Sequence, residues 1–204
     1  MYADDTKLSS AVMCDGTPNT LANDLKLLEE WSDKFQMRFH PDKCHVMHIG
    51  NNNPKHEYTM SKGEELHKLE KVSSEKDLGI LIDDKLKFSE HINIKVNKAN
   101  QILGCIKHTF KHLTKDVFKL LYKSLVRPHL EYNSVIWSPH LKKDMDSIER
   151  VQRRATKMVP ELRNLSYEDR LRQLELPTLK FRRDIADIIE VYNILTENQI
   201  HYFL

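Results

Sequence analysis

The chain has 204 residues, of which 30% are charged and 40% are hydrophobic. This composition is typical of one or two globular domains and excludes a disordered tail or a fibrous protein. No apolar run approaches the roughly 20 residues of a membrane-spanning helix, and the N-terminus lacks a signal-peptide pattern. Three widely spaced cysteines, Cys14, Cys44 and Cys105, favour free thiols in a reducing compartment. We therefore expect an intracellular protein, in the nucleus or cytoplasm, with no membrane partner.

The net charge of +2 conceals an uneven distribution. Residues 1–84 carry 10 Lys+Arg and 16 Asp+Glu, whereas residues 85–127 carry 10 and 2, and residues 128–204 carry 12 of each. An acidic segment followed by a basic one indicates two parts with different partners. The first would suit cations and the second an anionic polymer.

The first part alternates between β and α patterns. Residues 2–13 predict a β-hairpin with Asp4-Asp5 at its tip, and Thr17-Pro18 is a helix-start signal. A helix of about 20 residues should then bury one face, whose members are Leu21, Leu25, Leu28, Trp31 and Phe35.

Strands follow that helix. His40-Pro41 should end it, and residues 44–49 predict a strand paired with residues 57–61. Residues 76–83 predict a further strand. The resulting order, β-β-α-β-β-β, is typical of an α+β unit, and we place its end near residues 85–88.

After Phe88 the apolar period changes to 3.6 residues, which predicts an all-α bundle. Ser89 is expected to cap a first long helix through Phe110, and Thr114 to cap a second one that Pro128 stops. In the second helix the expected inward residues are Val117, Leu120, Leu121 and Leu125. Further helices are expected at 132–137, 144–159 and 166–174, and a last one after Pro177 with an apolar stripe of Phe181, Ile185, Ile188, Tyr192 and Leu195.

Basic residues follow the helical period in this second part. Lys115, Lys119, Lys123 and Arg127 form one stripe, which we expect opposite an apolar face centred near Leu121. A second group lies on the 144–159 helix and consists of Arg150, Arg153, Arg154 and Lys157, while Lys95 and Lys98 flank the core face of the first helix. Such stripes suit phosphate backbones, where binding is independent of sequence and sensitive to salt. They are also what any soluble amphipathic bundle shows on its solvent face.

Asp4-Asp5 is the sharpest chemical feature. Two adjacent carboxylates repel each other unless a cation or solvent neutralises them, and a divalent metal would remove the repulsion. Aspartate is also a common turn residue, so the pair by itself leaves a purely structural role open.

The segment Tyr2-Ala3-Asp4-Asp5-Thr6, set between two β segments, resembles the catalytic hairpin of reverse transcriptases. The downstream sequence is similar to the non-LTR (LINE, jockey-like) retrotransposon branch of that family. The resemblance runs in order through the helix that includes Trp31, Pro41–Cys44, Lys76–Ile80, Leu86–Ile92, Tyr132–Pro139 and Ile148–Ala155. It covers essentially the whole chain.

The resemblance implies a partial polymerase palm over residues 1–87, built of antiparallel hairpins and one long helix, and a thumb-like helical bundle over residues 88–204. In this family the hairpin carboxylates help to hold two divalent ions for nucleotidyl transfer. By resemblance Asp4 and Asp5 are then catalytic metal ligands for Mg²⁺ or Mn²⁺, Asp5 as the supporting carboxylate.

Other roles also follow from the resemblance alone. Tyr2 would pack near the primer end, and Leu78 and Gly79 would belong to the primer-grip hairpin. Lys43 would polarise the leaving pyrophosphate, although its spacing also suits an ordinary solvated lysine. The helical unit would hold an RNA–DNA or DNA duplex through the phosphate backbone.

The family's site needs a further aspartate and the fingers from upstream positions. We therefore expect the chain by itself not to be a competent polymerase, with dNTP bound only in a complete one. The alternative is a non-catalytic nucleic-acid-binding remnant that acts through the basic thumb. A third possibility is a degenerate product without either function, whose exposed edge at residues 2–13 favours aggregation.

Overall fold

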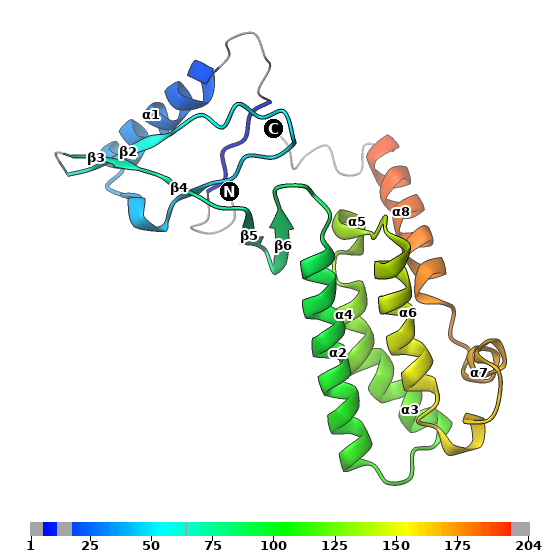
Figure 1. Cartoon of the computed structure of the whole chain (residues 1–204). Helices are drawn as coiled ribbons and strands as arrows, with labels where there is room; N and C mark the ends of the chain where they lie inside the picture. Colours follow the sequence, from blue (N-terminus) through cyan, green and yellow to red (C-terminus); the bar gives the residue numbers. More distant parts are fainter. Residues whose placement is uncertain (1–5, 12–17, 64, 197–204) are drawn as a thin grey trace. The chain divides into compact units, whose positions relative to one another are not determined.

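The computed structural model describes residues 6–11, 18–63 and 65–196 (Figure 1). The chain divides into two compact units, residues 1–86 and residues 87–204. The division lies one residue from the boundary that we expect between 87 and 88. The first unit combines one long helix with small sheets and the second is helical, so the fold class is α+β.

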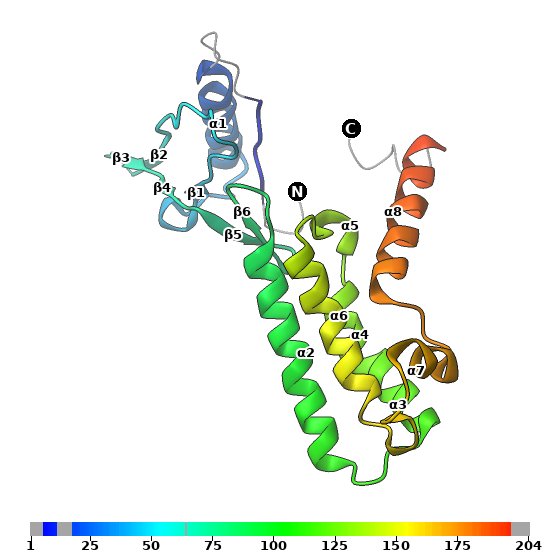
Figure 2. The same ribbon diagram turned by 45° about the vertical axis from the view of Figure 1, so that its right-hand side comes forward.

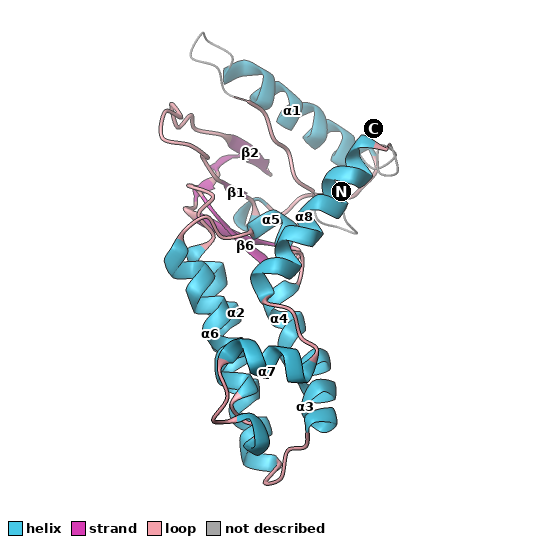
Figure 3. Ribbon diagram, turned by 90° about the vertical axis from the view of Figure 1, so that its right-hand side faces the viewer, coloured by secondary structure: helices cyan, strands magenta, loops and turns pink. Residues whose placement is uncertain are grey.

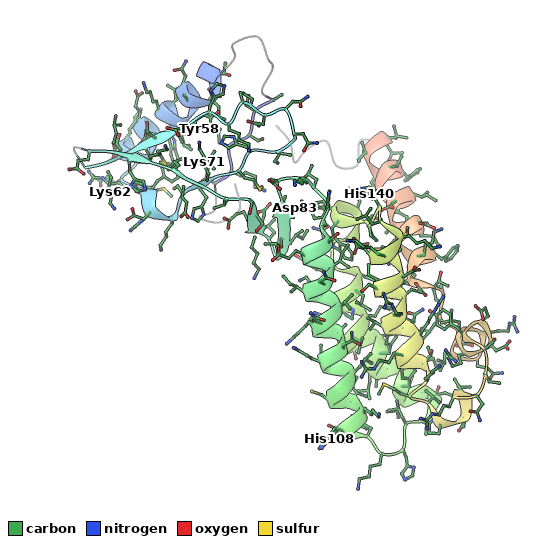
Figure 4. The ribbon with its side chains drawn as sticks, in the orientation of Figure 1. Tyr58, Lys62, Lys71, Asp83, His108 and His140 are labelled. Atoms are coloured by element: carbon green, nitrogen blue, oxygen red, sulfur yellow. The ribbon has the colours of Figure 1, made fainter. Side chains whose placement is uncertain are left out.

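Helix α1 (Pro18–Lys34) provides part of the core of the first unit. Leu21, Ala22 and Leu25 pack against a buried cluster that includes Tyr58 and Met60. Figure 4 labels Tyr58 at this position beside α1. The stripe is half-buried from Leu21 to Leu28 and exposed beyond it. Trp31 and Phe35, predicted as core, are 38% and 55% exposed, and their rings contact each other with centroids 5.1 Å apart.

The strands of the first unit form three two-stranded sheets. After the short 3-10 helix η1 (Pro41–Lys43), β1 (His45–Val46) pairs in parallel with β4 (Glu70–Lys71). Strand β2 (Thr59–Lys62) pairs antiparallel with β3 (Glu65–Lys68), and Figure 4 labels Lys62 at the end of β2.

The predicted pairing of residues 44–49 with residues 57–61 is therefore wrong. A hairpin over residues 59–68 closes a far shorter loop than that pairing would, at a smaller entropic cost. Leu69 N then donates to Tyr58 O (2.9 Å), which extends the hairpin by one more hydrogen bond.

Residues 74–83 form a hairpin rather than the single strand predicted for residues 76–83. Strand β5 (Ser74–Asp77) pairs antiparallel with β6 (Ile80–Asp83), and Asp77 lies opposite Ile80. The two residues between them, Leu78 and Gly79, have φ of 44° and 85°. Two successive positive φ values are the signature of the tight turn whose twist matches that of a hairpin. Residues 6–11, the described part of the expected hairpin at 2–13, contain no strand.

The second unit is a helical bundle, in which α2 and α6 run side by side in both views (Figures 1 and 2). Its elements are α2 (Ser89–Thr109), α3 (Lys115–Leu121), the π-helical turn η2 (Tyr122–Val126), α4 (Arg127–Glu131), α5 (Ser134–Trp137), α6 (Lys142–Thr156), the 3-10 helix η3 (Pro160–Leu162), α7 (Tyr167–Leu174) and α8 (Leu179–Leu195). Figure 3 shows that these helices are joined by short loops. None of the helices that the structure describes has the length and apolarity required to cross a membrane.

Two predicted helix starts have different outcomes. Thr114 caps α3 as predicted, since its hydroxyl accepts from Val117 N (3.4 Å). The predicted cap Ser89 is instead the first residue of α2, and Phe88, with φ of 56°, holds the cap position. The Ser89 hydroxyl donates to the buried carboxylate of Asp144 (2.6 Å) and thereby connects α2 to α6.

The second predicted helix continues past Pro128 and buries a different face. The buried residues are Phe118, Tyr122, Val126 and Leu130, whereas Val117, Leu120 and Leu125 are exposed. The π-helical turn before α4 explains the first difference, because it widens the helix just before Pro128, which lacks a backbone N–H and enters α4 in its first turn. Val117 and Leu120 precede this turn, so their exposure reflects the face of α3 that carries Phe118 and packs into the bundle.

A hydrogen-bonded hub joins four helical elements of this unit. The side chain of Gln152 is buried on α6, accepts from the Tyr122 hydroxyl (2.6 Å), and donates to the Tyr167 hydroxyl (3.1 Å) and to Pro177 O (2.9 Å). Tyr167 in turn donates to Glu149, whose carboxylate accepts from Leu179 N (3.1 Å) at the start of α8. The polar groups of η2, α6, α7 and α8 are thus satisfied by each other.

Candidate nucleic-acid interface

An open pocket of about 500 Å³ lies where the end of α6 meets α7. Arg153 and Lys157, both predicted as nucleic-acid contacts, line it from the α6 side. The loop before α7 contributes Arg163, and α7 itself contributes Arg170. The remaining lining residues are Asn164, Leu165, Ser166, Tyr167 and Glu168. Four cationic side chains and one carboxylate therefore face one cavity.

Arg170 is the fixed element of this pocket. Its side chain is buried, its Nε donates to Thr156 Oγ1 (3.0 Å), and its Nη1 donates to Leu165 O (2.7 Å). These two bonds tie the loop before α7 to the end of α6. Since a guanidinium has five N–H donors, Arg170 can hold this loop and still contribute its positive charge to the pocket.

Tyr167 positions a second guanidinium. The Cζ atoms of Arg153 and Arg170 lie 5.0 Å and 5.6 Å from the centroid of its ring. The ring itself is held by the hydrogen bonds of its hydroxyl to Glu149 and Gln152. Burial, and next the hydrogen bond to Glu149, raise the pKa of Tyr167, which stays a neutral phenol at physiological pH. The hub thus orders an exposed arginine at the mouth of the pocket through a cation–π contact.

The N-terminus of α7 is capped by a side chain of the chain itself. Ser166 Oγ accepts from Asp169 N (3.1 Å) and donates to Asp169 Oδ2 (2.7 Å). Asp169 also accepts from Arg172 (2.9 Å). The electropositive character of the pocket therefore comes from its arginine and lysine side chains and not from the helix terminus.

The predicted stripe from Lys115 to Arg127 is largely compensated by nearby acids. Lys115 lies 3.8 Å from Glu161, and Lys119 lies 3.2 Å from Glu175 and 3.7 Å from Asp116. The hydrogen bond to Glu175 raises the pKa of Lys119.

Arg127 and Lys123 complete that stripe. Arg127 is 3.5 Å from Glu131, which also binds Arg182. Lys123 is exposed. The stripe therefore presents less positive charge to a ligand than its spacing alone indicates.

The other predicted basic residues lie in two places. Lys95 and Lys98 are close enough to His129 that their charges add to the effect of burial in lowering its pKa, and Lys95 Nζ lies 5.9 Å from the Tyr132 ring centroid. On α6, Arg154 reaches across to Asn100 Oδ1 of α2 (3.3 Å), and Arg150 Nε donates to Asp146 O of its own helix (3.3 Å).

Sequence reasoning missed Arg163 and Arg170. Neither is part of a helical stripe with the α6 residues, because Arg163 lies in a loop and Arg170 is on a different helix. The signal available in the sequence was the density of arginines from Arg150 to Arg172. That density does not indicate that the Arg170 side chain is buried.

The predicted catalytic residues of the first unit are only partly described. Tyr2, Asp4 and Asp5 lie outside the described residues. Lys43 is an exposed residue at the end of η1. Leu78 and Gly79 form the β5–β6 turn.

Two ion pairs involve the residues next to Leu78 and next to Lys43. The Lys7 ammonium pairs with Asp77, the residue before Leu78. Asp42, beside Lys43, accepts two hydrogen bonds from Lys62 Nζ (2.7 Å each), and these bonds lower the pKa of Asp42. Asp42 is thus neutralised within the chain.

The implied metal site cannot be assembled from the described part of the chain. Among the residues that the structure describes, no group of three or more His, Cys, Asp or Glu side chains could hold a metal ion. Asp4 and Asp5, the ligands that the resemblance implies, are not among those residues.

The chain is similar to an uncharacterized protein of Caenorhabditis elegans, with 30% identity over 133 residues, which amount to 62% of this chain and 65% of that protein. The chain thus spans less than two thirds of that relative's length. No protein-family model matches the chain. No solved structure matches it.

Proposed function

We propose that the helical unit holds a nucleic-acid duplex by its phosphate backbone, as the thumb of a reverse transcriptase similar to those of non-LTR retrotransposons. The observation that carries the proposal is the convergence of Arg153, Lys157, Arg163 and Arg170 on one open pocket. The order of an α+β unit followed by a helical unit supports it, since a palm followed by a thumb would have this order. Action inside the cell, in the nucleus or cytoplasm, belongs to the same proposal.

The pocket chemistry favours phosphate over other ligands. Arginine presents several N–H donors in a plane and binds phosphate oxygens in pairs, whereas lysine acts as a point charge. Four cations against Glu168 leave the pocket strongly electropositive, and its openness suits a continuous polymer better than an enclosed small molecule. Backbone binding of this kind is independent of base sequence.

The nucleotidyl-transfer part of the proposal rests on the resemblance. Asp4 and Asp5 would hold Mg²⁺ or Mn²⁺, which would supply charge stabilisation for phosphoryl transfer. A primer-extension assay with Asp4→Asn and Asp5→Asn variants tests this part separately. We expect no template-dependent synthesis from the chain by itself. Robust synthesis would overturn that expectation, and its loss in both variants would assign the metal to Asp4 and Asp5. The alternative of a non-catalytic binding remnant predicts duplex binding that neither variant changes.

The binding proposal is tested by fluorescence anisotropy of an RNA–DNA hybrid with the full chain at several salt concentrations. The triple variant Arg153→Gln, Lys157→Gln, Arg163→Gln removes three pocket charges and leaves the buried Arg170 in place. Each lost phosphate contact should reduce the slope of log Kd against log salt by about 0.9. The expected reduction for the triple variant is therefore about 2 to 3.

The matched control changes the same number of positive charges at exposed positions away from the pocket, Lys142→Gln, Lys143→Gln and Lys180→Gln. We expect a smaller loss of affinity and a smaller change of slope for this control. Equal effects of the two triple variants would mean that binding depends only on the net charge of the protein, and would contradict a specific role for the pocket. No binding at low salt would contradict the proposal as a whole.

A further inference from the structure

Helix α8 packs on the bundle with its more polar side. The residues of this helix that are buried are Leu179 and Arg183. Arg182, on the same side, forms two hydrogen bonds to Glu131, of which that from Nη2 measures 3.0 Å. Its main packing partners are α5 and α6, and the Arg182–Glu131 ion pair adds a contact with the end of α4. Leu179, Arg182 and Arg183 thus hold α8 on the bundle.

The opposite side of α8 is apolar and exposed. Sequence periodicity predicts Phe181, Ile185, Ile188, Tyr192 and Leu195 as a buried stripe, but all five are exposed. Their exposed fractions, with those of the flanking apolar residues, are Phe181 55%, Ile185 41%, Ile188 68%, Ile189 53%, Val191 55%, Tyr192 62% and Leu195 76%. A surface helix normally has the reverse orientation, with its apolar stripe inward. A continuous apolar face of this kind marks an interaction surface.

The spacing of the residues on this face allows it to pair with the same face of a second copy whose helix runs in the opposite direction. The stripe alternates steps of four and three residues, which is the spacing of helices that pack along a common seam. A two-fold axis near Ile188 would bring Phe181 of one copy towards Leu195 of the other, and Ile185 towards Val191. The charged residue within the face, Asp184, would then lie near the Tyr192 hydroxyl of the other copy, which can donate a hydrogen bond to it.

We propose that two copies of the chain associate through an antiparallel pairing of their α8 apolar faces. The seven exposed residues present the surface of about four whole residues, or roughly 800 Å² per copy at about 200 Å² each. A standard interface buries about 800 Å² per partner, so a partner that covers the whole face reaches this size. Antiparallel helices also place opposite ends of their dipoles together, whereas parallel helices place like ends together. The interface is isologous, as in most dimers.

The oligomeric state of the full chain, measured by sedimentation velocity over a concentration series, tests this pairing. We expect a reversible monomer–dimer equilibrium. Ile188→Glu places a charge at the centre of the interface and should leave only monomer. Asn97→Glu introduces the same charge at an exposed position of α2 and should leave the dimer unchanged. Circular dichroism of both variants serves to check that they retain their helices.

A crosslinking measurement keeps the test valid if Ile188→Glu unfolds. In a chain whose native cysteines are changed to serine, Ile188→Cys should form an intermolecular disulfide under mild oxidation. Phe181→Cys should not, because the antiparallel arrangement separates the two copies of position 181. A monomer at all concentrations, a series of larger aggregates, or crosslinking at position 181 with none at position 188 would each overturn the proposal.

Discussion

The change Gln152→Leu should strongly destabilise the helical unit. Leucine has a similar size but cannot replace the three hydrogen bonds of the Gln152 amide. The Tyr122 hydroxyl, on a side chain only 1% exposed, would lose its acceptor, and Pro177 O would lose its donor. Tyr167 would keep Glu149 as its acceptor. Each buried polar group left without a partner costs about 1–3 kcal/mol, so the expected loss is about 3 kcal/mol of unfolding free energy.

A double-mutant cycle separates the hydrogen bond from simple loss of packing. Tyr122→Phe alone should cost about 1 kcal/mol, the ordinary net value of one hydrogen bond. Combined with Gln152→Leu it removes the hydroxyl that the leucine leaves without a partner. The double variant should therefore be less destabilised than the two single effects predict, by about 1 kcal/mol.

The assay is urea denaturation of the full chain, followed by the fluorescence of Trp137 in a Trp31→Phe background. Trp137 is buried in the helical unit, so its emission reports unfolding of that unit. Gln152→Leu should also lower the melting temperature by about 10 °C. A loss below about 1 kcal/mol, or strictly additive effects in the cycle, would refute the reasoning that the hub is satisfied only by its own members.

Two further predictions concern pH and the β5–β6 turn. Burial, and secondly the charge of Lys95, lower the pKa of His91 from 6.5 to about 4. The unfolded state then binds the proton more tightly, so this contribution to stability is complete above pH 6.5 and is lost as the pH falls towards 4. This contribution amounts to about 3 kcal/mol. His91→Gln should therefore flatten the pH dependence of the unfolding free energy between pH 4 and 6.5. An unchanged slope in this variant would contradict the prediction. In the turn, Leu78→Asn should stabilise the hairpin by about 0.5 kcal/mol, because asparagine before glycine tolerates positive φ better than leucine. Amide exchange of residues 74–83 should then slow by roughly twofold, whereas Gly79→Ala should accelerate it, and the opposite pair of results would contradict the turn geometry.

Local patterns predicted the helices of this protein well. The segments expected after Ser89 and Thr114, around residues 144–159 and 166–174, and after Pro177 all correspond to helices, because the 3.6-residue period and the capping residues act within a few positions of the chain. The change of period near residue 88 likewise falls beside the division between the two units. The π-helical turn at Tyr122–Val126 was the exception, since a one-residue shift of register leaves no signal in the apolar spacing.

Strand pairing was less predictable, because it depends on partners distant in sequence. Both β1 and β2 lie in segments expected to form strands, yet they pair with β4 and β3 rather than with each other. A strand of two to four residues carries too short a pattern to specify its partner.

The amino-acid sequence alone determined the positions of most helices, the concentration of positive charge in the second half, and the resemblance on which the functional proposal rests. Only the tertiary structure decided which charges are available to a ligand. Lys115 and Lys119 meet Glu161 and Glu175 across more than 40 residues of sequence, whereas Arg153 and Lys157 join Arg163 and Arg170. It also turned the apolar face of α8 outward. Charge compensation and the choice of buried face depend on neighbours that folding brings together, and a helical period describes only what one helix presents.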